Sequence, residues 1–312
     1  MRKLIYAAVL GSVFLPISLQ AGPLLSPSEI QFGQTYPLRD SVALTLTRAK
    51  YTVARVNIGA ASYFPQAGEK LLVLHFRIQN LTKDSLAFDA GTIPFSVVDA
   101  AGATHKSVQD VGVEATHQTA EFDLKPGEVK DDLYTALITS ATGADKTLIV
   151  EAGREGIEEE SLRCSLSGQV TPLDALKSVP AAGGVFYPLA LLDARLDTTA
   201  YTSLPLGGIR PDEEHRYFTT TFTVLNKSAG KHGVSGMNFV PILRDTQGKS
   251  IEYNQIILKP AEDVSGDAVL SPDAEMSVRF FWTLPKSARA QSLSLAEGQS
   301  RAYVFDVSGT KL

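Results

Sequence analysis

The chain has 312 residues and a formal net charge of −5 at pH 7, from 29 Lys and Arg against 34 Asp and Glu. A mildly acidic chain without a basic cluster repels phosphate, which argues against nucleic acid and against electrostatic binding to anionic lipid. The single cysteine, Cys164, excludes an intramolecular disulfide, and its apolar surroundings in Leu162–Leu166 predict a buried side chain rather than a catalytic thiol.

The first residues have the features of a secretory signal. Arg2 and Lys3 form a basic start, Leu4–Leu15 is apolar, and small residues lie near Ala21. The apolar run is shorter than the roughly 20 residues that a membrane-spanning helix needs, so we favour a cleaved signal over an anchor. We therefore expect residues 1–21 to be a signal peptide, the mature protein to be periplasmic or secreted, and no transmembrane segment to remain after cleavage.

Strand patterns dominate the rest of the chain. Val42–Thr47 alternates apolar and polar residues, which is typical of a half-buried strand. The run Leu71–Ile78 places four large apolar side chains on one face, those of Leu72, Leu74, Phe76 and Ile78. His75 falls on the opposite face, where we expect an exposed side chain.

Three local patterns recur at a constant offset of 146 residues (226 − 80). The recurring pairs are Asn80-Leu81-Thr82 with Asn226-Lys227-Ser228, Asp99–Gly102 with Asp245–Gly248, and Leu124–Gly127 with Leu270–Asp273. The first pair ends apolar strands, the second forms turns, and the third precedes a further strand. A repeat of this length predicts two copies of one β-rich module.

The recurring polar residues are expected to hold the scaffold together. An Asn at a strand end bonds the backbone two residues on, although both Asn triplets also match the N-glycosylation acceptor pattern. In a tight hairpin an Asp accepts bonds from nearby amides and a Gly adopts positive φ. We therefore assign structural roles to Asn80, Asn226, Asp99, Gly102, Asp245 and Gly248.

The last long strand of the second copy contains the only tryptophan. Val278, Phe280 and Trp282 share a face, and the offset of 146 aligns Phe280 and Trp282 with Tyr134 and Ala136. We expect Trp282 to fill the core where the first copy has a small residue, which is a structural role rather than ligand stacking.

Helical patterns are short and few. Glu155–Leu166 and Thr171–Ser178 each predict a short helix. We expect an all-β chain of two tandem immunoglobulin-like antiparallel β-sandwiches with few short helices. The first domain would cover residues 22–179, a linker 180–185, and the second domain 186–312.

The strand-end and turn motifs together resemble a known family. Ile78–Thr82, Val98–Gly102 and Leu124–Glu128 look like the corresponding motifs of the DUF4352-type immunoglobulin-like domains of exported bacterial proteins. The resemblance covers most of residues 36–150 and, more loosely, 187–307. It implies a non-catalytic accessory or binding module and transfers no active-site residue.

One segment of the second copy has no counterpart of similar composition in the first. Gly230–Asn238 contains Lys231, His232, Ser235 and Asn238, and binding sites favour variable loops on rigid scaffolds. We name these four residues as the candidate binding loop, with a mobile connection without a ligand as the alternative.

No catalytic or cofactor motif stands out in the sequence. The histidines lack zinc-binding spacing, although His105 and His117 lie in one inter-strand region. Ser228 and Lys231 fit the S-x-x-K pattern of penicillin-recognising enzymes, but they follow a strand, whereas that chemistry needs a helix start. We predict no catalytic residue, no metal and no cofactor.

The leading hypothesis is an exported, non-catalytic protein with a binding or structural role in the cell envelope. Its partner would be an envelope protein or a cell-surface component of unknown identity. Two alternatives stay open: a hydrolase whose catalytic residues are dispersed in the sequence, and a protease-inhibitor-like module. Because the first remains possible, the sequence leaves enzymatic activity undecided.

Overall fold

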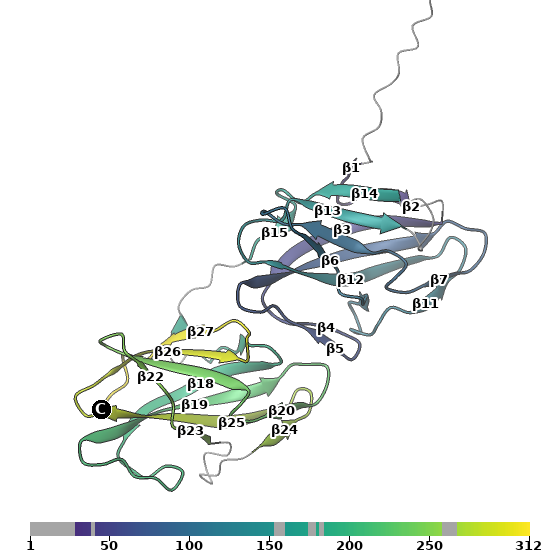
Figure 1. The fold of residues 1–312 in the computed structure, drawn as a ribbon. Coiled ribbons are helices and arrows are strands. Elements are labelled where there is room, and N and C mark those ends of the chain that lie inside the picture. Colours follow the sequence, from purple (N-terminus) through teal and green to yellow (C-terminus); the bar gives the residue numbers. More distant parts are fainter. Residues whose placement is uncertain (1–28, 39–40, 153–159, 174–178, 181–183, 258–266) are drawn as a thin grey trace, which may run out of the picture.

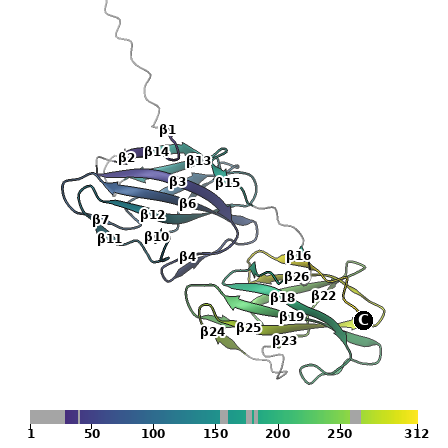
Figure 2. The same cartoon turned by 180° about the vertical axis from the view of Figure 1, so that it is seen from behind.

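The computed structural model describes residues 29–38, 41–152, 160–173, 179–180, 184–257 and 267–312. The chain forms two β-sandwiches in series (Figures 1 and 2), which confirms the predicted fold class. No helix occurs among the described residues, so the few short helices expected from the sequence are not found there. The predicted signal peptide, residues 1–21, lies outside the described ranges.

The first sandwich packs two sheets against each other. One sheet has the spatial order β1 (Glu29–Ile30), β14 (Glu160–Ser165), β13 (Thr147–Ala152), β8 (Phe95–Val98) and β9 (Thr104–Lys106). The other has the order β10 (Gly112–Val113), β12 (Val129–Ser140), β6 (Glu69–Asn80), β3 (Val42–Thr52) and β15 (Val170–Thr171), with β2 (Thr35–Leu38) also paired to β3. Two two-stranded ribbons complete it: the antiparallel pair of β7 (Leu86–Phe88) and β11 (Phe122–Leu124), and the hairpin of β4 (Val56–Ile58) and β5 (Ala61–Tyr63).

The second sandwich has the same strand order over most of its length. One sheet runs β16 (Val179–Pro180), β27 (Tyr303–Asp306), β26 (Ala290–Glu297), β21 (Phe239–Asp245) and β22 (Ser250–Ile251). The facing sheet runs β17 (Tyr187–Pro188), β18 (Leu192–Thr202), β19 (His215–Asn226), β25 (Glu275–Pro285) and β23 (Gln255–Ile257). A ribbon of β20 (His232–Val234) and β24 (Ala268–Leu270) corresponds to β7 and β11.

Each sandwich buries the apolar face that the alternating pattern predicts. In β6 that face consists of Leu72, Leu74, Phe76 and Ile78, all within the first core. In β19 its counterpart consists of Phe218, Thr220, Phe222 and Val224, all fully buried. Burial of the large apolar members contributes about 1.5–3 kcal/mol each. Thr220 is the exception, because its hydroxyl is buried without a hydrogen-bond partner among the described residues.

The predicted helix over Glu155–Leu166 is wrong in its described part. Residues 160–165 form β14, because Leu162, Cys164 and Leu166 are buried in strand alternation. A period of two residues buries these side chains on one side of a sheet, which a helix could not do. Burial also raises the pKa of the Cys164 thiol to about 11. Within the second predicted helix, Thr171 ends strand β15, and residues 174–178 lie outside the description.

A β-bulge changes the alignment of the two copies in their last long strand. The ladder between β12 and β6 shifts register between Lys130 and Leu133, which adds a residue to β12. Beyond the bulge Leu137 pairs with Leu72, and the equivalent pair in the second sandwich is Trp282 with Phe218. Trp282 therefore corresponds to Leu137, so the predicted match with Ala136 is wrong by one residue. Trp282 is fully buried in the second core.

The domain boundary is close to the end of the first module. Val179 and Pro180 pair with Phe305 and Asp306, so their backbone belongs to a sheet of the second sandwich. The sequence places Val179 in the first domain and Pro180 in the linker. Of that linker, residues 181–183 lie outside the described ranges.

The recurring Asn residues make the same hydrogen bonds in both copies. Asn80 Oδ1 accepts from the Thr82 amide (2.8 Å), and its Nδ2 donates to the carbonyls of Asp84 (2.8 Å) and Leu124 (2.9 Å). In the second copy Asn226 Oδ1 accepts from the Ser228 amide (2.9 Å). Its Nδ2 donates to the carbonyls of Gly230 and Leu270, each at 2.9 Å. Both side chains thus tie a strand end to the adjacent ribbon.

The two Asp–Gly hairpins are equally alike. Asp99 Oδ1 accepts from the amides of Ala101 and Ala103, each at 2.9 Å, while Gly102 has φ 91°. Asp245 Oδ1 accepts from the amides of Gln247 and Lys249, also at 2.9 Å, while Gly248 has φ 79°. A side chain would be strained at either glycine, because L residues rarely adopt this region.

Replacing either buried Asn should destabilise its sandwich. We expect Asn80→Ala and Asn226→Ala each to lower the free energy of unfolding by about 1–3 kcal/mol, since buried carbonyls lose their donors. Chemical denaturation measures the change, and the exposed Gln247→Ala is the control. Unchanged stability in both Asn variants would contradict the structural assignment.

Candidate functional site

The outer face of the central sheet in the first sandwich is covered. Side chains of the sheet face outward there at Leu71, Val73 and Tyr134, and they pack with Ile58 of the β4–β5 hairpin in a second apolar cluster. The hairpin leaves the end of β3, folds across this face, and returns to β6. A sheet face that would otherwise be solvated is therefore partly enclosed.

The same hairpin contacts the second sandwich. It lies between the two bodies in both views (Figures 1 and 2). Asn57 Nδ2 donates to the Lys227 carbonyl at 2.8 Å, and Ser62 Oγ accepts from the Ala229 amide at 3.1 Å. The hairpin thus docks on the turn that follows Asn226.

Arg55 makes the strongest polar contact of this junction. Its Nη2 lies 2.5 Å from Asp193 Oδ1, and its Nε donates to the Ala190 carbonyl at 2.9 Å. The Arg55 and Asp193 side chains are 5% and 18% exposed, so the pair is largely shielded from water. Removing one partner of such a shielded pair lowers stability by more than an exposed ion pair contributes to it, because the remaining charge is left buried and unpaired.

A pocket of about 300 Å³ lies beneath the hairpin, beside this junction. Its volume is at the lower end of the range for small-molecule sites. The walls come from β3, β6, β12, the hairpin and the segment after β10, and they combine apolar and ionisable side chains. The lining consists of Lys50, Thr52, Ala54, Arg55, Val56, Asn57, Val73, His75, Glu114, His117 and Tyr134.

His75 is the most unusual residue of the pocket. It is 5% exposed, so the expectation of an exposed strand histidine is wrong; the hairpin and the segment after β10 cover the outer face. Arg48 Nη2 lies 3.3 Å from His75 Nδ1. Glu114 Oε2 lies 3.4 Å from the same Nδ1, but only the Arg48 contact has hydrogen-bond geometry. A guanidinium only donates, so Nδ1 accepts from Arg48 and the neutral ring carries its proton on Nε2.

That Nε2–H group is buried and has no hydrogen-bond partner among the described residues. A buried donor left without an acceptor costs about 1–3 kcal/mol. Burial, with a further contribution from the Arg48 charge, lowers the pKa of His75 to about 4, against the raising effect of Glu114. The imidazole is therefore neutral near pH 7.

Tyr134 forms the floor of the pocket and holds the hairpin. Its hydroxyl donates to the Asn57 carbonyl at 2.5 Å and lies 3.0 Å from His117 Nδ1. Because that hydroxyl proton is already donated, His117 Nδ1 is the donor to the phenolic oxygen. Burial raises the pKa of Tyr134 to about 12. Gly112 lies over the ring, where a Cβ atom would come within 2.6 Å of it.

The ionisable groups of the pocket are unequally paired. Glu114 forms an ion pair with Arg48, and Arg55 pairs with Asp193. Lys50 is exposed, lines the pocket, and has no ion-pair partner in the described part of the chain. The pocket therefore has one uncompensated positive charge on its rim.

The predicted binding segment Gly230–Asn238 is more ordered than a loop. His232 begins strand β20, which pairs with β24 as β7 pairs with β11 in the first sandwich. A structural counterpart thus exists at the offset of 146, with Leu86 in the place of His232. Lys231 is exposed beside it.

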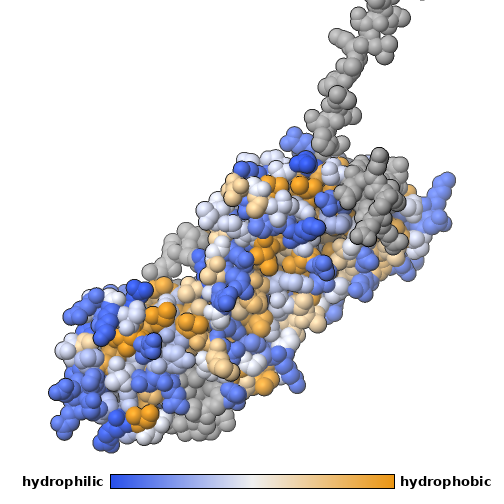
Figure 3. All heavy atoms as spheres, viewed as in Figure 1, coloured by the Kyte–Doolittle hydropathy of each residue, from blue (hydrophilic) through white to orange (hydrophobic). Residues whose placement is uncertain are grey.

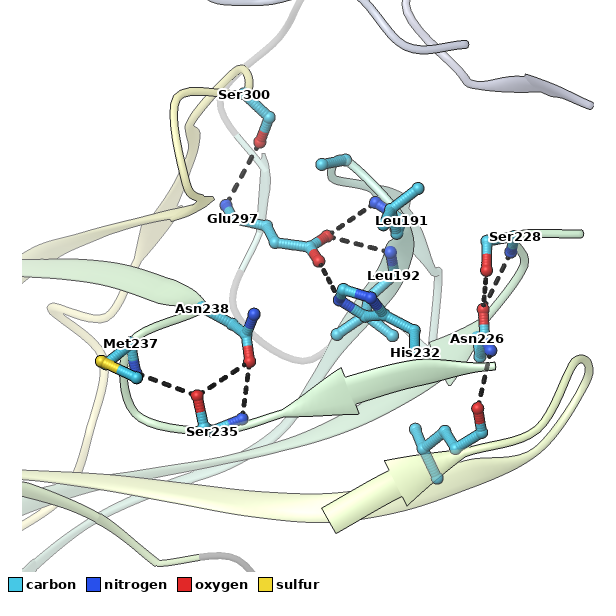
Figure 4. A network of polar contacts seen from close by, with 12 residues as sticks. Leu191, Leu192, Asn226, Ser228, His232, Ser235, Met237, Asn238, Glu297 and Ser300 are labelled. Atoms are coloured by element: carbon cyan, nitrogen blue, oxygen red, sulfur yellow. Dashed lines mark hydrogen bonds and ion pairs between the residues drawn. The ribbon is translucent and has the colours of Figure 1, made fainter. Parts of the chain in front are cut away.

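Polar contacts fix the predicted binding residues in place (Figure 4). His232 Nε2 lies 2.8 Å from Glu297 Oε1, and Glu297 Oε2 accepts from the amides of Leu191 and Leu192. Asn238 Oδ1 accepts from the Ser235 amide at 2.7 Å and from its hydroxyl at 3.0 Å. His232, Ser235 and Asn238 thus have structural partners, and a role of this segment in binding stays a prediction.

Sequence reasoning missed the pocket residues because their proximity depends on tertiary pairing. His75, Glu114 and Tyr134 come from three separate strands or segments and share no motif. The available signal was weak: His75 interrupts a buried strand, and β6 is apolar on both faces at Leu71 and Val73. A strand apolar on both faces predicts cover on both sides.

His105 and His117, which the sequence places in one inter-strand region, have different partners in the structure. His105 Nε2 lies 2.9 Å from Asp99 Oδ2, and His117 contacts Tyr134. Within the described ranges no group of three or more His, Cys, Asp or Glu is placed to hold a metal ion. No helix in those ranges is long and apolar enough to span a membrane.

The surface is mixed in character on the face shown in Figure 3. Hydrophobic residues interleave with hydrophilic ones over both sandwiches. Single exposed apolar residues are normal on a protein surface and indicate no partner by themselves.

The buried neutral His75 should make stability depend on pH. Because its pKa is about 4 in the fold and 6.5 in the unfolded chain, the unfolded state binds more protons between these values. The free energy of unfolding should therefore fall as pH decreases from 6.5 to 4, with His75 contributing on the order of 2–3 kcal/mol. Denaturation midpoints of the wild type and His75→Gln over this range test the effect; parallel curves would contradict it.

Comparison with known proteins identifies solved structures of low sequence identity. No protein-family model and no curated protein matches the chain. Among solved structures, it is similar to an uncharacterized beta-sandwich protein from Clostridium difficile 630, with 12% identity and a TM-score of 0.33, covering 43% of this chain and 97% of that one. It is also similar to the yjhA protein from Bacillus subtilis, with 13% identity and a TM-score of 0.29, covering 42% and 99%.

Proposed function

We propose that the protein is a non-catalytic binding protein of the cell envelope and that the pocket beneath the β4–β5 hairpin is its ligand site. The observation that carries the proposal is the buried, unpartnered Nε2–H of His75 in a pocket of about 300 Å³. His75 Nε2 has less than 1 Å² of accessible surface, so a ligand in the pocket would reach it only after a small movement of the side chains around it. An acceptor atom that did so would satisfy this donor. Three other buried polar atoms also lack partners among the described residues, those of Arg216, Thr220 and Trp282, but of the four residues only His75 lines this pocket.

The chemistry of the pocket favours binding over hydrolysis. A general base works best with a pKa near the working pH, whereas that of His75 is about 4. The Tyr134 hydroxyl is committed to the Asn57 carbonyl, and Thr52 Oγ1 accepts from the Ala54 amide at 3.0 Å. The cysteine thiol is buried in the other sheet. These groups are suited to orienting a ligand.

The wider setting of the proposal comes from the sequence. We take residues 1–21 as an export signal and the two sandwiches as a duplicated DUF4352-type module. The partner in the envelope would be a protein or a cell-surface component that binds the surface of the sandwiches. The pocket would bind a separate, small ligand. The shared strand order of the two sandwiches supports the duplication.

A fragment screen tests the ligand site. Residues 22–312 would be screened by ligand-observed NMR against a library of small carboxylates, amines and neutral alcohols. We expect at least one fragment to bind the wild type and the control His215→Leu but not His75→Leu. Leucine matches the buried volume and removes the unpaired donor, so the variant should fold. Absence of binding by every fragment, or equal binding to all three proteins, would overturn the proposal.

Export has a test of its own. Residues 1–21, fused to an alkaline phosphatase that is active only outside the cytoplasm, should give enzyme activity in a Gram-negative host. Replacing Leu10 and Leu15 with Arg interrupts the apolar run and should abolish that activity, because export requires an apolar core. Activity that survives the double substitution would contradict the signal assignment.

A further inference from the structure

Resting on the proposed function, we infer that the pocket takes a small ligand with a single carboxylate, held between Lys50 and the Nε2–H of His75, with its apolar body against Val56, Val73 and Tyr134. Neither donor was named by the sequence as a site residue. The inference specifies the chemical class of the ligand.

The charge balance of the pocket favours an anion. Arg55 is neutralised by Asp193, and the Glu114 carboxylate by Arg48, which leaves Lys50 as the uncompensated charge. A ligand with one negative charge makes the local balance neutral. A ligand with two would face Glu114 without a second free cation on the described walls.

The two donors lie on one sheet face at a spacing that suits a carboxylate. Lys50 pairs with Val73 in the ladder, and Arg48 pairs with His75, so Lys50 and His75 are diagonal neighbours on adjacent strands. Diagonal neighbours are about 7–8 Å apart, within reach of a long lysine side chain. Once a small movement of the surrounding side chains uncovers His75 Nε2, which has less than 1 Å² of accessible surface, one carboxylate oxygen can accept from His75 and the other from Lys50.

The second sandwich provides an internal comparison. The positions that correspond to Lys50 and His75 in its ladder are Ala200 and Thr221, which pair with Thr219 and Arg279. The donor pair is absent there, although the strand order is the same. The site is thus specific to the first sandwich and is not a general property of this sheet face.

The test uses three probes of the same shape: benzoate, benzylamine and benzyl alcohol. They would be titrated into residues 22–312 while the ¹⁵N resonances of the His75 ring are followed. We expect benzoate to bind most tightly of the three and to shift the Nε2 resonance. Lys50→Met should weaken the binding of benzoate about tenfold, which is the effect of losing one charge-assisted hydrogen bond, and should leave the affinity for benzyl alcohol unchanged. Lys83→Met, at an exposed lysine beyond the strand-ending Asn80, is the matched control.

The outcomes separate this inference from the proposed function. If benzylamine or benzyl alcohol binds at His75 more tightly than benzoate, or if Lys50→Met binds benzoate like the wild type, the carboxylate assignment falls while the pocket remains a ligand site. If no probe and no library fragment shifts the His75 resonances, both proposals fall.

Discussion

The hydrogen bond from the Tyr134 hydroxyl to the Asn57 carbonyl is the contact on which the arrangement of the site depends. It fastens the β4–β5 hairpin across the outer face of the central sheet. The hairpin covers the face over the pocket, and Asn57 of the hairpin and the preceding Arg55 contact the second sandwich. A backbone bridge between Gln66 and Ser300 also joins the two sandwiches. Gly112 contributes by leaving the space that the tyrosine ring occupies.

Much of the scaffold could be predicted from local sequence, because turns and strand ends are local structures. The bonds of Asn80 and Asp99 involve residues two to four positions away, in addition to a contact across the ribbon. The core faces of β6 and β19 followed from alternation alone. The predicted alignment of Trp282 with Ala136 was wrong because one extra residue in the bulge of β12 moves every later side chain of that strand to the opposite face. No residue pattern near Lys130 predicts this bulge.

The site itself was out of reach of local patterns. His75 was placed on the correct face, but its burial depends on the hairpin and the segment after β10, which return to this face through long-range contacts. The predicted binding segment Gly230–Asn238 was chosen because it differs between the copies, and its role in binding stays a prediction. The Gly230–Asn238 segment differs in composition yet keeps the strand pairing of its counterpart. The copies also differ in the ladder at Lys50 and His75, where the second sandwich has Ala200 and Thr221.

Arg55 belongs to two structures at once, since it forms part of the pocket wall and its guanidinium is held by Asp193 of the second sandwich. A ligand that contacts this wall shares a residue with the joint between the sandwiches. By thermodynamic reciprocity, if ligand binding changes the free energy of contact between the sandwiches, that contact changes the binding free energy of the ligand by the same amount. A mechanical force that separates the two sandwiches would then change the affinity of the pocket for a ligand. Ligand binding would in turn change the force needed to separate them.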